Sequence, residues 1–196
     1  MSLSVQNKKK TERVTDKKSV KLTVFEMVLF AMFSAMMFIS KIVMEFLPNI
    51  HLIGVFVVLL TVVYRKKALI PIYLFVLLQG IYGGFAVWWI PYLYVWTVLW
   101  AVVMLLPKNM GKTAQMIVYP IVCALHGLLF GVLYAPVQML VFSFDFKQIV
   151  AWVAAGLPFD ITHAIGNLVA GLLIYPMSVI LKKLNKKYIL FRIKML

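Results

Sequence analysis

The sequence has few acidic residues and only one cysteine. Six of the 196 residues are Asp or Glu, against 20 Lys and Arg, which gives a formal net charge of +14. The single Cys123 excludes an intramolecular disulfide. The chain also has no Walker-type phosphate loop, no G-x-S-x-G and no H-E-x-x-H. It therefore lacks the sequence signatures of ATP hydrolysis, of α/β-hydrolases and of zinc proteases, and we do not expect an enzyme.

Apolar residues, in contrast, are abundant. They make up 64% of the chain, and the mean hydropathy is +0.97, whereas soluble domains are about 45–50% apolar. This composition predicts an all-α integral membrane protein, folded as a compact bundle of six transmembrane helices. The second segment is short for a full crossing. The six apolar segments are about Val24 to Leu47, Ile50 to Tyr64, Ala68 to Phe85, Val87 to Leu106, Ala114 to Phe142 and Leu157 to Leu181.

The basic residues lie on one side of this bundle. All of the 20 Lys and Arg except Lys41 and Lys147 flank the ends that would share one membrane face, so the positive-inside rule places both termini in the cytoplasm. The same distribution argues against nucleic acid as a partner. We expect a disordered basic tail over residues 1–22, a membrane domain over 23–182 and a basic cytoplasmic segment over 183–196.

The last apolar segment contains the most unusual residues. Asp160, His163 and Asn167 follow i, i+3, i+7 spacing and share one helical face. Facing lipid, a charged group would cost at least about 2.5 kcal/mol near the bilayer centre. The face therefore predicts either a functional site in the outer half of the helix or an interhelical hydrogen-bond network that only holds the bundle together.

Further polar and aromatic residues gather near the same outer end. Four of the five tryptophans lie between Gln79 and Trp100, with three glycines among them. Some belong to a membrane-interface belt, but interrupting glycines also indicate a shaped cavity wall. Lys41 and Glu45 either neutralise each other or edge this cavity. The candidate substrate-binding residues are Trp88, Trp89, Tyr92, His126, Asp160, His163 and Asn167. His126, His163 and Asp160 lack a recognisable metal-ligand spacing, so we expect no metal and no cofactor.

The first apolar segment carries a small-x-x-x-small pattern at Ala31 and Ala35. Two alanines one turn apart allow close approach of another helix. That helix belongs either to the bundle itself or to a partner protein.

Three features together resemble the substrate-binding S component of an energy-coupling factor (ECF) vitamin transporter: the six-segment layout, the A-x-x-x-A, and the final G-x-P-x-D-x-x-H-A-x-x-N. The resemblance implies a subunit of the bacterial plasma membrane that binds a vitamin or related micronutrient at its outer side. It also implies partners, namely a transmembrane T component docked at Ala31 and Ala35 and two cytoplasmic ATPases.

Two other classes stay open from the sequence. An autonomous small carrier or channel is the main alternative, although ionisable groups are nearly absent from the inner half of the bundle. An intramembrane enzyme is disfavoured because Ser34 and the histidines lie toward opposite ends. The outer aromatics and acids favour a planar heterocycle, neutral or cationic, as the ligand.

Overall fold

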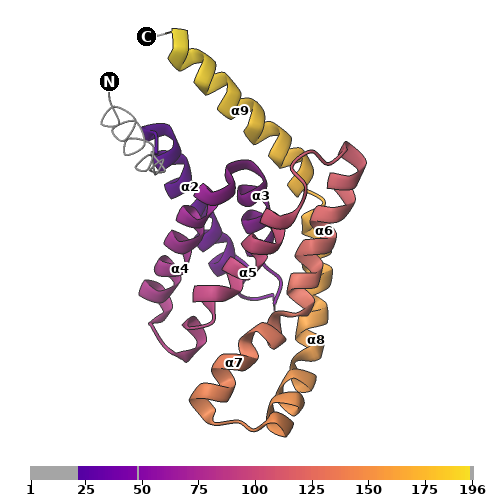
Figure 1. Cartoon of the computed structure of the whole chain (residues 1–196). Coiled ribbons are helices and arrows are strands. Elements are labelled where there is room, and N and C mark those ends of the chain that lie inside the picture. The colour runs from indigo at the N-terminus through magenta and orange to yellow at the C-terminus, as the bar shows by residue number, and fades with distance from the viewer. Residues whose placement is uncertain (1–21, 48, 195–196) are drawn as a thin grey trace, which may run out of the picture.

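The computed structural model describes residues 22–47 and 49–194, and this part of the chain is helical without strands (Figure 1). The predicted all-α fold is confirmed. The predicted tail over residues 1–22 lies outside the described residues apart from Leu22. The α-helices are α2 (Val24–Val43), α3 (Ile53–Tyr64), α4 (Leu69–Gly83), α5 (Tyr92–Leu105), α6 (Lys112–Leu128), α7 (Phe130–Phe142), α8 (Phe146–Gly171) and α9 (Ile174–Lys194), with short 3-10 helices η1 (Arg65–Ala68) and η2 (Val87–Trp89).

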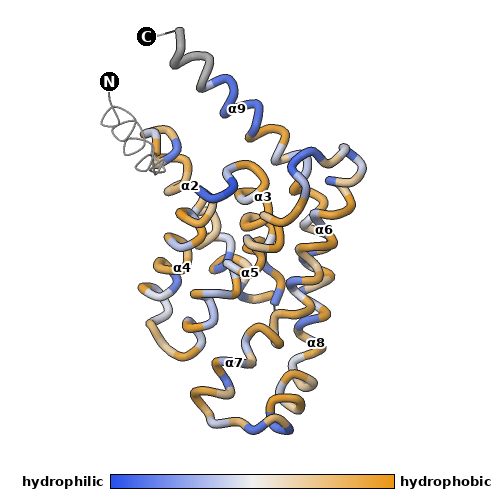
Figure 2. The backbone as a smooth tube through the Cα atoms, in the orientation of Figure 1, coloured by the Kyte–Doolittle hydropathy of each residue, from blue (hydrophilic) through white to orange (hydrophobic). Residues whose placement is uncertain are grey.

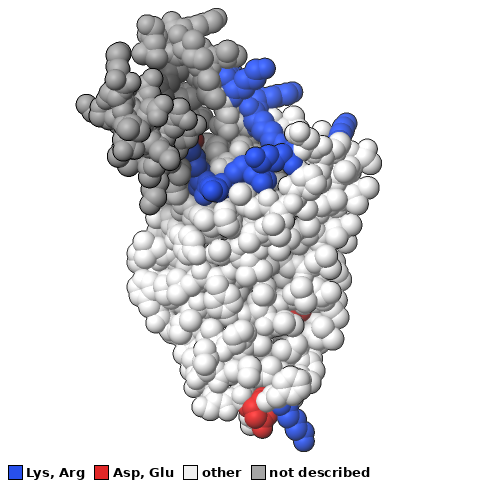
Figure 3. All heavy atoms as spheres, in the orientation of Figure 1, with Lys and Arg blue, Asp and Glu red and all other residues white. Residues whose placement is uncertain are grey.

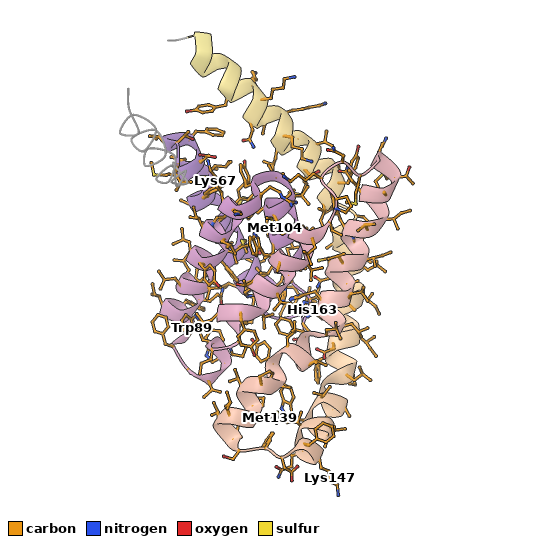
Figure 4. The ribbon with its side chains drawn as sticks, in the orientation of Figure 1. Lys67, Trp89, Met104, Met139, Lys147 and His163 are labelled. Carbon is orange, nitrogen blue, oxygen red and sulfur yellow. The ribbon has the colours of Figure 1, made fainter. Side chains whose placement is uncertain are left out.

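A capping box starts α2. The Thr23 hydroxyl accepts a hydrogen bond from the Glu26 N–H at 3.1 Å, and the Glu26 carboxylate accepts one from the Thr23 N–H at 2.9 Å. Both bonds satisfy backbone donors that a helix start leaves unpaired. The same carboxylate forms a salt bridge with Lys67 of η1 at 2.6 Å (Figure 4). The start of α2 is thus tied to the turn between α3 and α4.

The short helix α3 forms the centre of the bundle. Every residue from Ile53 to Thr61 is buried, and the helix packs against α5, α6 and α9. A helix that is apolar on all sides gains most when other helices surround it completely. Its 12 residues span roughly 18 Å, less than the ~30 Å of a bilayer core.

The last two predicted segments have different boundaries in the structure. The fifth is divided at Leu129 into α6 and α7. The expected helix start at Leu157 is wrong, because α8 begins at Phe146, where Asp145 and Gln148 form a second capping box. Asp160, His163 and Asn167 therefore lie in the middle of α8 and its second half.

Among the described residues, four helical stretches are long and apolar enough to cross a membrane: Val24–Val43, Val87–Leu105, Lys112–Phe142 and Phe146–Gly171. Orange, apolar residues dominate the body of the tube in Figure 2. Lys and Arg gather at the end that contains η1 and α9 (Figure 3), while Lys147 marks the opposite end (Figure 4). This separation of charge from a broad apolar zone is typical of membrane proteins.

Glycines permit a close contact between α6 and α8. A Cβ atom on Gly127 would lie 2.9 Å from the Asn167 amide nitrogen and 3.1 Å from the Ala164 backbone nitrogen. A Cβ atom on Gly171 would lie 2.8 Å from the Pro120 Cα atom. Backbone atoms cannot move aside as a flexible side chain can, so these two positions require glycine.

We expect Gly171→Ala to destabilise the protein by about 1–3 kcal/mol, since its methyl group would press against the Pro120 backbone. Gly156→Ala is the matched control on the same helix, because a Cβ atom there meets nothing within 4 Å and alanine favours helix. Thermal unfolding in detergent should show a lower Tm for Gly171→Ala only. Equal Tm values for the two variants would contradict the close α6–α8 contact.

Candidate functional site

A cavity of about 530 Å³ opens at the end of the bundle opposite η1. It is surrounded by the end of α2, the segment leading into α3, η2, the start of α5, α7, and α8 as far as Asp160. Aromatic and aliphatic side chains make up most of its walls, with a few charged groups among them, which is the usual make-up of a small-molecule site. The lining residues are Lys41, Met44, Glu45, Leu47, Asn49, Ile50, His51, Trp88, Tyr92, Phe130, Gly131, Tyr134, Trp152, Gly156, Phe159 and Asp160.

Contacts between rings hold the aromatic wall in place. The Tyr92 ring lies 5.6 Å from the Trp88 ring, with an interplanar angle of 89°. The Tyr134 ring lies 4.9 Å from that of Phe130, and its hydroxyl donates to the Trp88 carbonyl at 3.3 Å. Such pairs add about 0.5–1.5 kcal/mol beyond their buried area. The wall is therefore formed before any ligand enters.

Two glycines at the end of α4 place Trp88 over the cavity. Gly84 ends the helix at φ +82°, a conformation that side-chain-bearing residues rarely adopt. A Cβ atom on Gly83 would lie 2.7 Å from the Trp88 ring. The predicted role of the interrupting glycines in shaping a cavity wall is thus consistent with their positions.

Asp160 connects α8 to the start of α7. It is 4% exposed, and its carboxylate accepts a hydrogen bond from the Gly131 N–H at 3.0 Å. A negative charge in the first turn of α7 also interacts favourably with the helix dipole. Asp160 therefore stabilises the α7 start while one side of its carboxyl group faces the cavity.

Three histidines form a cluster at the cavity wall, where His51 lines the cavity and His126 and His163 lie behind it. The His51 and His163 rings lie 4.6 Å apart, and His163 also lies 4.9 Å from Phe130. The His126 ring lies 5.6 Å from that of Trp96, and one His126 ring nitrogen bonds the Val95 carbonyl at 3.1 Å. We call His51, His126 and His163 the histidine cluster.

Polar atoms of this region lack partners among the described residues. Both ring nitrogens of His163 and the Trp96 indole N–H are unpaired, although the two side chains are 1% and 0% exposed. One ring nitrogen each of His51 and His126 is also unpaired. Each such atom costs about 1–3 kcal/mol unless a ligand or water satisfies it. His51 lies between α2 and α3. Burial lowers its pKa well below the ordinary value, and the nearby His163 and Lys41 lower this pKa further. The His51 ring is therefore neutral near pH 7.

Asn167 serves the helix packing directly. Its amide nitrogen donates to the Cys123 carbonyl of α6 at 3.1 Å, and the side chain lies against Gly54 and Gly127. It is 1% exposed and does not line the cavity. The contact with α6 is what the structural alternative for the polar face predicts. Its amide oxygen has no partner among the described residues.

The predicted site residues thus fall into three groups. Trp88, Tyr92 and Asp160 line the cavity, whereas His126, His163 and Asn167 lie behind it. Trp89 is elsewhere: its indole N–H donates to the Val76 carbonyl at 2.8 Å, on the α4 side of the bundle, away from His163 in Figure 4. The lining residues that sequence reasoning did not assign to the site include His51, Phe130 and Trp152.

Lys41 and Glu45 do edge the cavity. They also line a second cavity of about 290 Å³, shared with Trp88 and Tyr92. These four residues line both spaces and so lie between them. Of the two interpretations of Lys41 and Glu45, the one that places them at the edge of the cavity agrees with this geometry.

Ala31 and Ala35 lie on the outer face of α2. Both are exposed, whereas Phe30, Phe33 and Ser34 of the same helix are buried. The Ser34 hydroxyl bonds the Pro71 carbonyl of α4 at 3.0 Å. The contact between α2 and α4 therefore uses other residues, and the two alanines are available to a further helix.

No group of three or more His, Cys, Asp or Glu side chains is placed to hold a metal ion in the part of the chain that the structure describes. Comparison with protein-family models, curated proteins and solved structures finds no match for this chain. The residues themselves must therefore indicate the function.

We expect His163→Leu to leave the protein as stable as the wild type or more stable by about 1–3 kcal/mol, because the change removes two unpaired buried nitrogens without a large change in volume. His126→Leu should show a smaller gain or a loss, since it also gives up the bond to Val95. The Tm of purified, ligand-free protein checks this. A clear fall in Tm for His163→Leu would mean that its ring nitrogens are paired in solution.

Proposed function

We propose that this chain is the substrate-binding membrane subunit of an ECF-type transporter and takes up a water-soluble vitamin or related micronutrient. The aromatic-walled cavity at the end opposite the basic residues is the main support. A transporter subunit needs such a preformed pocket on the side from which its ligand arrives.

The proposed topology has six crossings with both termini in the cytoplasm. Helices α2 and α4 and the α6–α7 pair would run outward, while α3, α5 and α8 with α9 would return. The contacts between α6 and α8 support this alternation, because they show that the two helices run antiparallel. Gly127, near the end of α6, lies against Ala164, whereas Gly171, further along α8, lies against Pro120, earlier in α6. Except for Lys41 and Lys147, the Lys and Arg then face the cytoplasm.

The chemistry of the cavity favours a flat ligand. Aromatic faces at Trp88, Tyr92 and Tyr134 offer stacking, and Asp160 and Glu45 offer hydrogen-bond acceptors. The unpaired nitrogens of the histidine cluster lie just behind Phe130. A neutral or cationic heterocycle with ring nitrogens or amino groups complements this set.

Uptake against a gradient requires an energy source outside this chain, which has no phosphate loop. A T component docked on α2 at Ala31 and Ala35, with two ATPases beneath it, would supply it. The outward position of both alanines supports this assignment.

The adjacent tryptophans provide a matched test of the site. Once mass spectrometry has identified the compound that purified protein retains from a mixture of B vitamins, its Kd can be measured on variants. Trp88→Leu should weaken binding about tenfold to a hundredfold, as expected for roughly 1.5–3 kcal/mol of buried aromatic contact. Trp89→Leu should leave the Kd unchanged, although it loses the bond to Val76. Equal effects of the two variants would contradict the cavity as the site.

Docking is tested separately on α2. Ala31→Leu and Ala35→Leu should reduce uptake and co-purification of the ATPases while the Kd for the ligand stays normal, because the cavity lies away from this surface. Ala154→Leu, at an exposed alanine of α8, is the control and should behave as the wild type. Uptake that needs no co-purifying ATPase would favour an autonomous carrier instead.

A further inference from the structure

A third cavity, of about 240 Å³, lies at the basic end of the molecule, far from the aromatic site. Residues from α3, η1, α5, α6, α9 and the segment after α5 surround it. Three of the lining side chains are cationic, and none of the described lining residues is acidic. The lining residues are Val62, Arg65, Val103, Leu106, Pro107, Lys108, Met110, Tyr119 and Lys182.

Three separate elements bring these cations together. Arg65 belongs to η1, Lys108 to the segment between α5 and α6, and Lys182 to α9. In the described part of the chain the salt bridge of Glu26 is made with Lys67, which does not line this cavity. Positive charges around one small space repel one another unless an anion lies between them. The arrangement therefore indicates an anionic ligand.

Arg65 is held in an unusual conformation. Its backbone has φ 53° and ψ −120°, a region costly for a residue with a side chain and most often found where function requires it. Its guanidinium donates to the Met104 carbonyl at 2.8 Å, and its own carbonyl accepts from the Trp100 indole N–H at 3.1 Å. The fixed guanidinium has five N–H donors. Donors beyond the one bonded to Met104 suit a phosphate oxygen.

Apart from Tyr119, whose hydroxyl bonds Gln115, the rest of the cavity wall is apolar. Val62, Val103, Leu106 and Met110 lie beside the cations, so a ligand that fits both parts is amphiphilic. The volume is below the ~300–1,000 Å³ of pockets for drug-sized ligands. It suits a headgroup and its first methylene groups better than a whole molecule, whose acyl chains would extend along the outside of the bundle.

We propose that this cavity binds the phosphate headgroup of an anionic phospholipid from the membrane leaflet at the basic end. Arg65 forms a fork-shaped contact with the phosphate, and Lys108 and Lys182 neutralise its charge. Basic pockets between helices at the cytoplasmic side are suited to such headgroups. This site is independent of the ligand proposed for the aromatic cavity.

Native mass spectrometry of the full chain in detergent tests the proposal with phosphatidylglycerol as the probe and phosphatidylcholine as the neutral comparison. We expect at least tenfold tighter binding of phosphatidylglycerol. Lys108→Gln and Lys182→Gln should each weaken it roughly fivefold, as expected for removing one cation at a lipid headgroup. Equal binding of the two lipids would overturn the proposal.

Two controls distinguish a lipid pocket from diffuse charge attraction and from a simple anion site. Lys112→Gln removes a cation at the same end of the bundle but outside the lining, and should change the affinity less than twofold. A loss as large as that of Lys182→Gln would show diffuse surface attraction and overturn the site. Glycerol phosphate and inorganic phosphate should bind far more weakly than the lipid. Equal affinity for either would show an anion site without a lipid and also overturn it.

Discussion

The close contact between α6 and α8 determines most of what surrounds the aromatic cavity. Gly127 and Gly171 let the two helices approach until the Asn167 amide reaches the Cys123 carbonyl. Within an apolar bundle that bond has no competing water. This contact fixes the position of α8 along α6. Asp160 then accepts a hydrogen bond from the Gly131 N–H and so orients α7. The position of α8 against α6 therefore also places the far wall of the cavity, which includes Phe130 and Tyr134.

The polar face of α8 serves two purposes at different depths. Asn167 contributes to packing, while Asp160 both caps α7 and reaches the cavity. His163 lies between them with neither ring nitrogen paired among the described residues. Packing alone does not account for a buried ring with two unpaired nitrogens, because an apolar residue would fit at lower cost. The structural interpretation of this face therefore accounts for Asn167, whereas the functional interpretation stays a prediction for Asp160 and His163.

Apolar runs alone are sufficient to predict helices in each of the six segments. A helix is the regular structure in which all backbone hydrogen bonds are made within one segment, as an apolar surrounding requires. They do not predict the start of α8. Lys147 and Gln148 make the stretch before Leu157 resemble a loop, although Asp145 and Gln148 carry a capping-box signature. Trp152 lies in this stretch, so the wrong helix start also leaves it out of the predicted site. His51 and Phe130 join the site only through the path of the chain between α2 and α3 and the break at Leu129, which no local pattern specifies.

The charged pair at the end of α2 links the two spaces at the outer end of the bundle. Lys41, Glu45, Trp88 and Tyr92 line both the 530 Å³ and the 290 Å³ cavities. Among the described residues no long helix follows Val43 until α3 begins at Ile53, and Asn49 has a left-handed backbone conformation. Glu45 lies on this connection, whereas Tyr92 is anchored in α5 against Trp96. The aromatic side of the cavity is therefore held by helix packing, while the side that carries Lys41 and Glu45 lies at the end of α2 and just beyond it.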